Sequence, residues 1–205
     1  MKLYTFPLSG HAHRAELFLS LVGAEHTLVP VALGQGEHKQ PAFLDLNIFG
    51  QVPVLDDDGT IVADSNAILV YVARKLERED WYPTDAKGAA DVQRWLSVAA
   101  GSLAFGPAAA RLVTVFGAPL DAESAIARSH NLFVTVEQHL EDRTWLASTD
   151  HPTIADVSWF SYVDSAPEGN VDLAAYPRIR ALLQRVRELP GFVPFQQSKA
   201  GLLAD

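Results

Sequence analysis

The sequence predicts two domains of different classes, an α/β domain followed by an all-α domain. In the first part of the chain, short apolar strand patterns alternate with amphipathic helix patterns in the order β-α-β-α-β-β-α. Farther along, alanine-rich helical periodicity continues and no strand pattern appears. A charged segment that leads into Trp81-Tyr82-Pro83 separates the two patterns. We therefore expect an α/β domain at 1–78, a linker at 79–84 and an all-helical domain at 85–205.

A βαβ unit opens the first domain. Residues 2–6 have a strand pattern, residues 11–22 have the apolar periodicity of a helix that ends at Gly23, and residues 26–31 form a second strand pattern. Because short links join these elements, we expect the two strands to be parallel. A polar loop and a short helix at 41–46 follow.

A β-hairpin and the helix after it organise the candidate site. The first strand of the hairpin, at 52–55, contains Pro53, and an acidic Asp-Asp-Asp-Gly turn leads to the second strand at 61–63. A proline cannot donate a hydrogen bond to a sheet, so it belongs at an edge or beside a bend. If the Val52-Pro53 bond is cis, the backbone before it is exposed and can pair with a peptide-like ligand.

Asp64 and Ser65 lie where the hairpin meets the next helix, and Ser65 is the expected N-cap of that helix. A hydroxyl, free backbone N–H groups and the positive end of a helix dipole suit a carboxylate. The carboxylate of Asp64 suits an ammonium group beside it. Together the two residues suit the amino-acid-like end of a short peptide, although an ordinarily capped helix with no ligand accounts for the same pattern.

The second domain contains only helix patterns, and Gly106-Pro107 is expected to kink or break the first of them. Thr153 and Asp156 have the spacing of a capping box, with Asp in place of the usual Glu or Gln, so we interpret Asp156 as structural. The expected helices cover residues 86–114, 121–140, 153–163 and 177–189, and a short terminal piece follows Gly191.

Composition excludes several classes of function. The formal net charge is −9 and the Lys and Arg residues are scattered, which argues against a nucleic-acid-binding surface. We find no apolar run of membrane-spanning length and no signal-peptide core, so a cytoplasmic protein with no membrane partner is expected. The chain has no cysteine, which excludes disulfides, zinc–cysteine sites and attack by a thiol of the protein itself.

Two long runs resemble the glutathione-binding domain of cytosolic glutathione S-transferases. They are GEHKQPAFLDLNIFGQVPVLDDDG and ADSNAILVYVARKL, and PLSGHAHR near the N-terminus is similar to the serine-type segment of that family. In the helical half, the segments 145–156 and 176–192 extend the similarity over nearly the whole chain. The chain looks like a serine-type, phi- or theta-like member of bacterial style. The resemblance implies a thioredoxin-like N-terminal domain, glutathione as co-substrate and a homodimer.

Ser9 is the candidate catalytic residue. Its position also suits a simple helix cap, but the resemblance makes it the hydroxyl that hydrogen-bonds the thiolate of glutathione, with Arg14 five positions later. Arg14 is expected to support the structure near Ser9 or an interdomain contact. Tyr4 is the rival hydroxyl, but it lies within a strand and is expected to pack. The glutathione thiol has a pKa near ~8.5, and lowering it by two units requires about 2.7 kcal/mol, which a hydroxyl and a helix N-terminus can supply together.

The resemblance also implies the residues that bind glutathione. His38 and Lys39 lie where phi-like members bind the glycyl carboxylate, although histidine and lysine in a polar loop are usually solvated. Asp64 stands where the family commonly has glutamate, and its shorter reach loosens the ammonium contact or shifts it to a water. The implied set for glutathione is His38, Lys39, Gln51, Val52 (through its backbone), Pro53, Asp64 and Ser65.

The pocket for the electrophile is less well defined. The resemblance places Leu8, Phe105 and Arg111 on its walls, although the same residues suit a core or an interface. His11 and His13 do not converge as a metal-binding pair on a helix, and no cluster of further ligands completes a site, so no metal is expected. The segment 47–50 departs from the family's usual Asn-Pro, which affects the loop before the site more than the chemistry.

The expected function is the transfer of glutathione to a small hydrophobic electrophile, as in detoxification. Ser9 stabilises the thiolate, and proximity to an electrophile in an adjacent apolar pocket supplies much of the remaining rate enhancement. A non-catalytic glutathione- or ligand-binding module on the same fold is the alternative from another class, and a glutathione-dependent isomerase or dehalogenase is the third. Loss of turnover in Ser9→Ala separates a catalyst from a carrier, and product analysis separates the third alternative.

Overall fold

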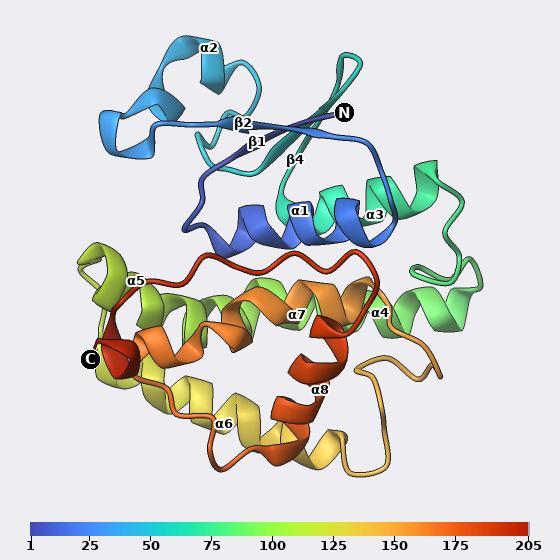
Figure 1. The fold of residues 1–205 in the computed structure, drawn as a ribbon, viewed down its shortest axis with the longest axis vertical. Helices are drawn as coiled ribbons and strands as arrows, with labels where there is room; N and C mark the ends of the chain where they lie inside the picture. Colours follow the sequence, from blue (N-terminus) through green and yellow to red (C-terminus); the bar gives the residue numbers. More distant parts are fainter. Residues whose placement is uncertain (205) are drawn as a thin grey trace. The chain divides into compact units, whose positions relative to one another are not determined.

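The computed structural model describes residues 1–204 and divides the chain into two compact units (Figure 1). The first unit contains Met1–Glu79 and Leu189–Gln196. The second contains Asp80–Glu188 and the described residues from Gln197 onward. A segment close to the C-terminus therefore completes the first unit, whereas the sequence predicts two consecutive domains. The domain boundaries expected from the sequence remain a proposal.

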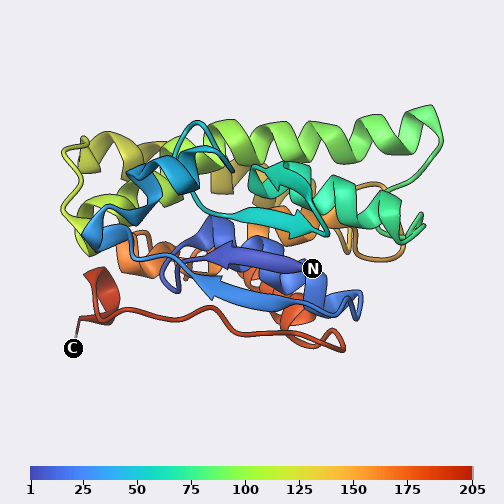
Figure 2. The ribbon, with the colours of Figure 1, turned by 90° about the horizontal axis from the view of Figure 1, so that it is seen from above.

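The first unit is built on a four-stranded mixed sheet with the strand order β2-β1-β3-β4. The arrows of β1 and β2 point the same way in Figure 2, and their register pairs Leu3 with Leu28. Strand β3 runs antiparallel to both β1 and β4 and pairs Leu55 with Leu3 on one side and with Val62 on the other. The predicted βαβ unit and hairpin are both present. The strands are β1 (Lys2–Thr5), β2 (Thr27–Pro30), β3 (Val54–Asp57) and β4 (Thr60–Ala63).

Helices cover both faces of this sheet, α1 (Gly10–Leu21) and α3 (Ser65–Lys75) on one and α2 (Pro41–Leu44) on the other (Figure 1). On the α2 side, Phe43 packs against Tyr4 with ring centroids 6.2 Å apart. Tyr4 therefore packs, as expected. The 3₁₀ turns η1 (Leu33–Gln35) and η2 (Glu37–Lys39) precede α2. The core on the α1 and α3 side includes Leu3, Leu17, Phe18, Leu55, Ile68, Leu69 and Val72.

The segment Leu189–Gln196, here called the C-terminal strap, lies against α1 within the first unit. The Ser20 hydroxyl donates to the carbonyl of Gly191 over 2.6 Å, near the end of α1. One turn after the start of α1, His13 Nε2 lies 2.9 Å from the carbonyl oxygen of Val193, and its ring stacks on Phe195 with centroids 4.9 Å apart. The strap therefore runs antiparallel to α1, from the C-terminal end of the helix toward its N-terminal end.

Among its described residues, the second unit contains helices joined by loops and no strand, as predicted. Gly106 and Pro107 do not break its first helix, which stays helical from Ala86 to Phe116. The segment around them, η3 (Ala99–Ala108), is a π-helix, whose wider turn accommodates the missing N–H of proline. The other elements are α4 (Ala86–Val98), α5 (Ala109–Phe116), α6 (Ala122–His139), α7 (Ile154–Asp164), η4 (Ala166–Gly169), α8 (Pro177–Arg187) and η5 (Gly201–Leu203).

The helix from Ala86 to Phe116 corrects one expectation from composition. Its length and composition would allow it to cross a membrane. The expectation that the chain has no apolar stretch of membrane-spanning length is therefore wrong for this helix. In the most apolar 18-residue segment of this helix, 44% of the segment is buried inside the protein. A single helix of this kind also occurs as the core helix of a soluble protein, and it is therefore weak evidence for a membrane span.

The predicted capping box opens α7. The Thr153 N–H donates to Asp156 Oδ2 over 2.9 Å, and the Thr153 hydroxyl accepts from the N–H of Ala155 over 3.2 Å. Asp156 Oδ1 also accepts from the N–H of Leu146 over 2.9 Å, so one buried carboxylate joins the preceding loop to the helix. These bonds give Thr153 and Asp156 the structural role expected from their spacing.

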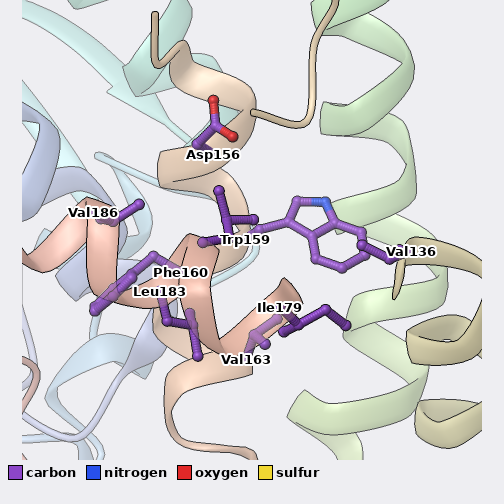
Figure 3. Close-up of a pocket in the computed structure, with 9 residues that line it drawn as sticks. Val136, Asp156, Trp159, Phe160, Val163, Ile179, Leu183 and Val186 are labelled. Atoms are coloured by element: carbon purple, nitrogen blue, oxygen red, sulfur yellow. The ribbon is translucent and has the colours of Figure 1, made fainter. Parts of the chain in front are cut away.

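A small apolar cavity of about 10 Å³ lies beside Asp156 (Figure 3). Its wall is formed by side chains of α6, α7 and α8. A cavity of this size holds at most one water molecule and would need several polar partners to do so. Since the Asp156 carboxylate already accepts backbone hydrogen bonds, we regard the cavity as a packing defect and not as a ligand site. The labelled wall residues are Val136, Asp156, Trp159, Phe160, Val163, Ile179, Leu183 and Val186.

Candidate functional site

Ser9 is the N-cap of α1. Its backbone is extended, with φ −86° and ψ 112°, and its hydroxyl oxygen accepts from the N–H of Ala12 over 3.2 Å. The side chain is only partly buried. A hydroxyl that accepts one hydrogen bond still has a hydrogen to donate. Capping the helix and donating to an anion at the helix N-terminus are therefore compatible roles for the same hydroxyl.

The loop before β3 contains a cis bond between Val52 and Pro53. Pro53 is buried, Val52 is half-buried and Gln51 is exposed. The strand begins at Val54, two residues later than predicted, because a proline nitrogen has no hydrogen to donate to the sheet. The carbonyl of Gln51 accepts from Asn47 Nδ2 over 2.8 Å, which fixes the loop from within the same unit.

Asp64, and not Ser65, is the N-cap of α3. It has a positive φ of 82°, and its Oδ1 accepts from the N–H of Ala67 over 2.9 Å. The expectation that Ser65 caps the helix is therefore wrong by one position, because the aspartate makes the capping bond itself. Ser65 becomes the first helical residue, where the backbone N–H has no partner inside the helix. Asp64 is exposed, and only one of its two carboxylate oxygens makes the capping bond.

Ser65 is 2% exposed, and residues of α1 contact its hydroxyl. Arg14 Nη1 donates to Ser65 Oγ over 3.0 Å and to Asn66 Oδ1 over 2.9 Å. His11 Nδ1 lies 3.3 Å from the same Ser65 oxygen. Arg14 thus joins α1 to α3. This contact fits the first of its two expected roles, support of the structure near Ser9. The sequence does not predict the contacts of His11 and Asn66 at this site. The only feature of the sequence that points to His11 is its position two residues after Ser9.

Burial determines the protonation of the two histidines on α1. Burial and the nearby Arg14 charge lower the pKa of His11 to about 3. Burial lowers the pKa of His13 to about 4, and the hydrogen bond to the Val193 carbonyl opposes that change. Both rings are therefore neutral at pH 7. Within residues 1–204, no group of three or more His, Cys, Asp or Glu side chains has the arrangement of a metal site.

Lys39 lies close to the loop that precedes β3. Its ammonium donates to the carbonyls of Phe49 and Gly50, each over 3.1 Å. An ammonium has three hydrogens, so one remains for a ligand carboxylate. His38 is half-buried and lies in the same turn, η2. Gly50 has φ 56°, and a Cβ there would lie 2.6 Å from the His38 carbonyl oxygen, so only glycine allows this close approach.

The three residues expected to line an electrophile pocket have different environments. Leu8 is half-buried in the first unit, and Phe105 is 63% exposed on η3 of the second. Arg111 is 1% exposed, and its Nε donates to Glu168 Oε2 over 2.7 Å. Because the charge of Arg111 is already paired with Glu168 inside the second unit, we correct the expectation for Arg111 and assign it a structural role.

The fold and these contacts define a class of protein. A thioredoxin-like sheet presents a serine at a helix N-terminus and a cis-proline loop, and it is joined to an all-helical unit. Two family models match the chain, the N-terminal domain of glutathione S-transferase over residues 1–74 and its C-terminal domain over residues 122–199. The chain belongs to the glutathione S-transferase family.

Relatives of known name and structure match almost the whole chain. "Glutathione S-transferase 3" of Zea mays is 34% identical and covers 94% of this chain and 91% of its own length. A maleylpyruvate isomerase of Ralstonia is 30% identical and covers 94% of each chain. A crystal structure of glutathione S-transferase from Pseudomonas fluorescens superposes with a TM-score of 0.89 at 29% identity, covering 96% of this chain and 98% of that one.

Proposed function

We propose that the protein is a serine-type glutathione S-transferase that stabilises the thiolate of glutathione with Ser9. The observation that carries this proposal is the Ser9 hydroxyl at the N-terminus of α1, a helix of 12 residues. Its hydrogen is free to be donated to a sulfur anion while its oxygen caps the helix. The helix dipole favours the same negative charge. Together they supply the ~2.7 kcal/mol that a two-unit decrease in thiol pKa requires.

We propose that the remaining residues of the first unit hold glutathione by its two charged ends. The buried Ser65 and the exposed Asp64 receive the carboxylate and the ammonium of the γ-glutamyl end. The third hydrogen of Lys39 is suited to the glycyl carboxylate. The backbone of Val52 pairs with the peptide in the manner of an added strand. The proposed set is His38, Lys39, Gln51, Val52, Pro53, Asp64 and Ser65.

The second substrate is proposed to be a small hydrophobic electrophile, with Leu8 of the first unit and Phe105 of the second each kept as a separate candidate contact. The 63% exposure of Phe105 supports this assignment, because a large exposed aromatic side chain offers an apolar contact for a ligand. We propose a cytoplasmic protein, because the chain belongs to the glutathione S-transferase family and resembles its cytosolic members.

The test is a glutathione titration at neutral pH that follows the ultraviolet absorption of the thiolate. We expect a saturable thiolate band in the native protein, its loss in Ser9→Ala and its partial recovery in Ser9→Thr, which keeps the hydroxyl. Ser9→Ala also removes a helix cap, which costs about 1 kcal/mol. Asp121→Ala is the matched control, since Asp121 caps α6 through the N–H of Ser124 and lies in the second unit.

Two results of this titration would redirect the assignment. If glutathione binds to the native protein without a thiolate band, the protein is a carrier and Ser9 is only a helix cap. If Asp121→Ala loses the band as fully as Ser9→Ala, the loss reflects weakened folding and not a missing hydroxyl. A band that is lost in Ser9→Ala alone supports thiolate stabilisation by that residue.

A glutathione-dependent isomerase is the second candidate, because a maleylpyruvate isomerase is among the 30%-identical relatives. In that reaction the thiolate adds to a carbon–carbon double bond and leaves again after rotation, so glutathione is regenerated. A transferase instead consumes one glutathione for each electrophile. Measuring free thiol during turnover of a cis-configured unsaturated diacid and of an aryl halide distinguishes the two reactions.

We also propose that the protein is a homodimer. Ile48 and Phe49 are adjacent large apolar side chains with exposures of 81% and 71%, the two largest such values among the exposed apolar residues. They occupy the loop between α2 and β3. A paired apolar exposure of this size is typical of a surface that a partner covers.

A further inference from the structure

Two helices meet at one buried oxygen atom in the first unit. Ser65 Oγ, at the start of α3, lies 3.0 Å from Arg14 Nη1 and 3.3 Å from His11 Nδ1, and both of those residues belong to α1. Arg14 is 1% exposed and Ser65 is 2% exposed. The contact therefore lies away from bulk water, where hydrogen bonds are stronger and a misplaced polar group costs more.

The chemistry of the three groups limits how the hydrogens are arranged. A guanidinium only donates, so Ser65 Oγ accepts from Arg14. His11 is neutral at pH 7 because burial and Arg14 lower its pKa to about 3. Its ring therefore has one N–H and one lone pair. If the hydrogen is on Nδ1, Ser65 Oγ accepts a second bond from His11, and the serine's own hydrogen is left to donate outward.

The geometry points to His11 as a positioning residue for the γ-glutamyl carboxylate of glutathione. In this arrangement, His11 Nδ1–H and Arg14 fill both lone pairs of Ser65 Oγ, so the hydroxyl donates only to a ligand. A carboxylate only accepts, so the preset hydroxyl is complementary to it. This inference rests on the proposed binding of glutathione, and it adds a residue that holds Ser65 in place from the helix that carries Ser9.

Two other roles for His11 fit the structure less well. A general base needs a pKa near the working pH, whereas that of His11 is lowered to about 3. Its Nδ1 also lies beside Ser65 and is thus not directed to Ser9, two residues earlier in the chain. A metal ligand would need partners, and the described residues contain no group of three suitable side chains.

The test is a double-mutant cycle on glutathione affinity, measured by calorimetry at pH 7. We expect His11→Ala to weaken binding about five- to tenfold, the effect of one buried hydrogen bond. In the Ser65→Ala background the same change should have little further effect, because the hydroxyl that His11 orients is gone. His11→Asn should restore most of the affinity, since its amide donates from nearly the place of Nδ1. His26→Ala is the matched histidine control, because His26 Nδ1 lies 2.8 Å from the carbonyl oxygen of Ala24, two positions earlier in the chain.

Two further readouts separate positioning from general structural support. Affinity for γ-glutamylcysteine should decrease with that for glutathione in His11→Ala, whereas affinity for cysteinylglycine, which lacks the γ-glutamyl carboxylate, should not change. With an aryl halide as electrophile, KM for glutathione should increase and kcat should stay close to the native value, because Ser9 is untouched.

The outcomes distinguish this inference from the proposed function. If the native protein does not bind glutathione, both are overturned. If it binds glutathione but the effects of His11→Ala and Ser65→Ala add fully, or cysteinylglycine is weakened equally, the role of His11 is overturned and the proposed function stands. Should His11→Ala fail to fold, native-like affinity in His11→Leu, which keeps volume without a donor, would overturn it in the same way.

Discussion

At the residue scale, Asp156 shows burial and hydrogen bonding acting on one carboxylate in opposite directions. Burial raises the pKa of Asp156 to about 6, while hydrogen bonds from the N–H groups of Leu146 and Thr153 act to lower it. In the unfolded chain the pKa of an aspartate is near ~3.9. The folded protein therefore binds the proton more tightly than the unfolded chain between about pH 4 and 6.

The sign of the resulting pH dependence follows from linkage. A raised folded-state pKa means that the contribution of Asp156 to stability is fully present below about pH 4 and decreases as the pH rises through about 6. In Asp156→Asn this part of the pH dependence should disappear. The variant should also lose about 1–3 kcal/mol of stability, because Leu146 and Thr153 donate to different oxygens of Asp156 and asparagine replaces one of these oxygens with an NH2 group that cannot accept.

Urea unfolding at pH 4.5 and pH 7, followed by tryptophan fluorescence, tests this prediction. All four tryptophans lie in the second unit, so the signal reports on the part of the protein that contains Asp156. Asp172→Asn is the control, since Asp172 is exposed and accepts one backbone hydrogen bond, from Ala174. Equal pH dependence in native protein and Asp156→Asn would show that this carboxyl is ionised alike in both states.

At the scale of elements, the C-terminal strap depends on one glycine. Gly191 has φ +85°, and a Cβ there would lie 2.7 Å from the backbone carbonyl oxygen of Ser20. Gly191→Ala should therefore lift the strap from the end of α1 and weaken the bond between Ser20 and residue 191. We expect faster amide hydrogen exchange in α1, together with a loss of stability of about 1–3 kcal/mol.

A second glycine, Gly117, separates the cost of a positive φ from the cost of the steric contact with Ser20. Gly117 has a similar positive φ of 65°, but a Cβ there would meet no atom within 4 Å. Gly117→Ala thus measures the cost of the backbone conformation alone. If the two variants lose equal stability, or if exchange in α1 is unchanged in Gly191→Ala, the close approach of the strap to α1 does not contribute to stability.

The elements also show what local sequence patterns predict and what they do not. The hairpin, the capping box and most helix positions follow from periodicity and capping residues within a few positions of one another. The π-helix at Ala99–Ala108 does not, because it continues through Pro107 in a segment that packs against α6, a contact that local patterns do not contain. The burial of Arg111 depends on Glu168, a partner 57 positions away, and a pattern of near neighbours contains no information about that distance.

In the candidate site, too, local patterns predict some features and distant contacts determine the others. Short motifs single out Ser9, Pro53, Asp64 and Ser65 as candidates, because each motif contains its own physical reason, and their roles toward glutathione are proposals. The cap of α3 was misplaced by one residue, since Asp64 and Ser65 are both good capping residues and only the backbone conformation distinguishes them. The contact between His11 and Ser65 joins residues 54 positions apart and appears only once the two helices pack.

At the scale of the whole molecule, the exposed pair Ile48 and Phe49 predicts self-association. Phe49→Ser should shift the protein toward a monomer by at least tenfold in dimer dissociation constant, because a buried phenylalanine contributes about 1.5–3 kcal/mol. Sedimentation velocity over a concentration series measures the shift. Leu120→Ser is the control, since Leu120 is also an exposed apolar residue, at 48%. A native protein that is monomeric at all concentrations would contradict the proposed dimer.

The C-terminal strap has a consequence for how the protein is made. The chain passes between the two units three times, after Glu79, after Glu188 and after Gln196. A ribosome therefore releases the strands and helices of the first unit long before it synthesises Gly191, Val193 and Phe195, which contact α1. Until then one side of α1 lacks its covering, and the nascent first unit remains incomplete while more than a hundred residues of the second are translated. A fragment that ends at the linker would lack the C-terminal strap, so its α1 would stay uncovered on that side.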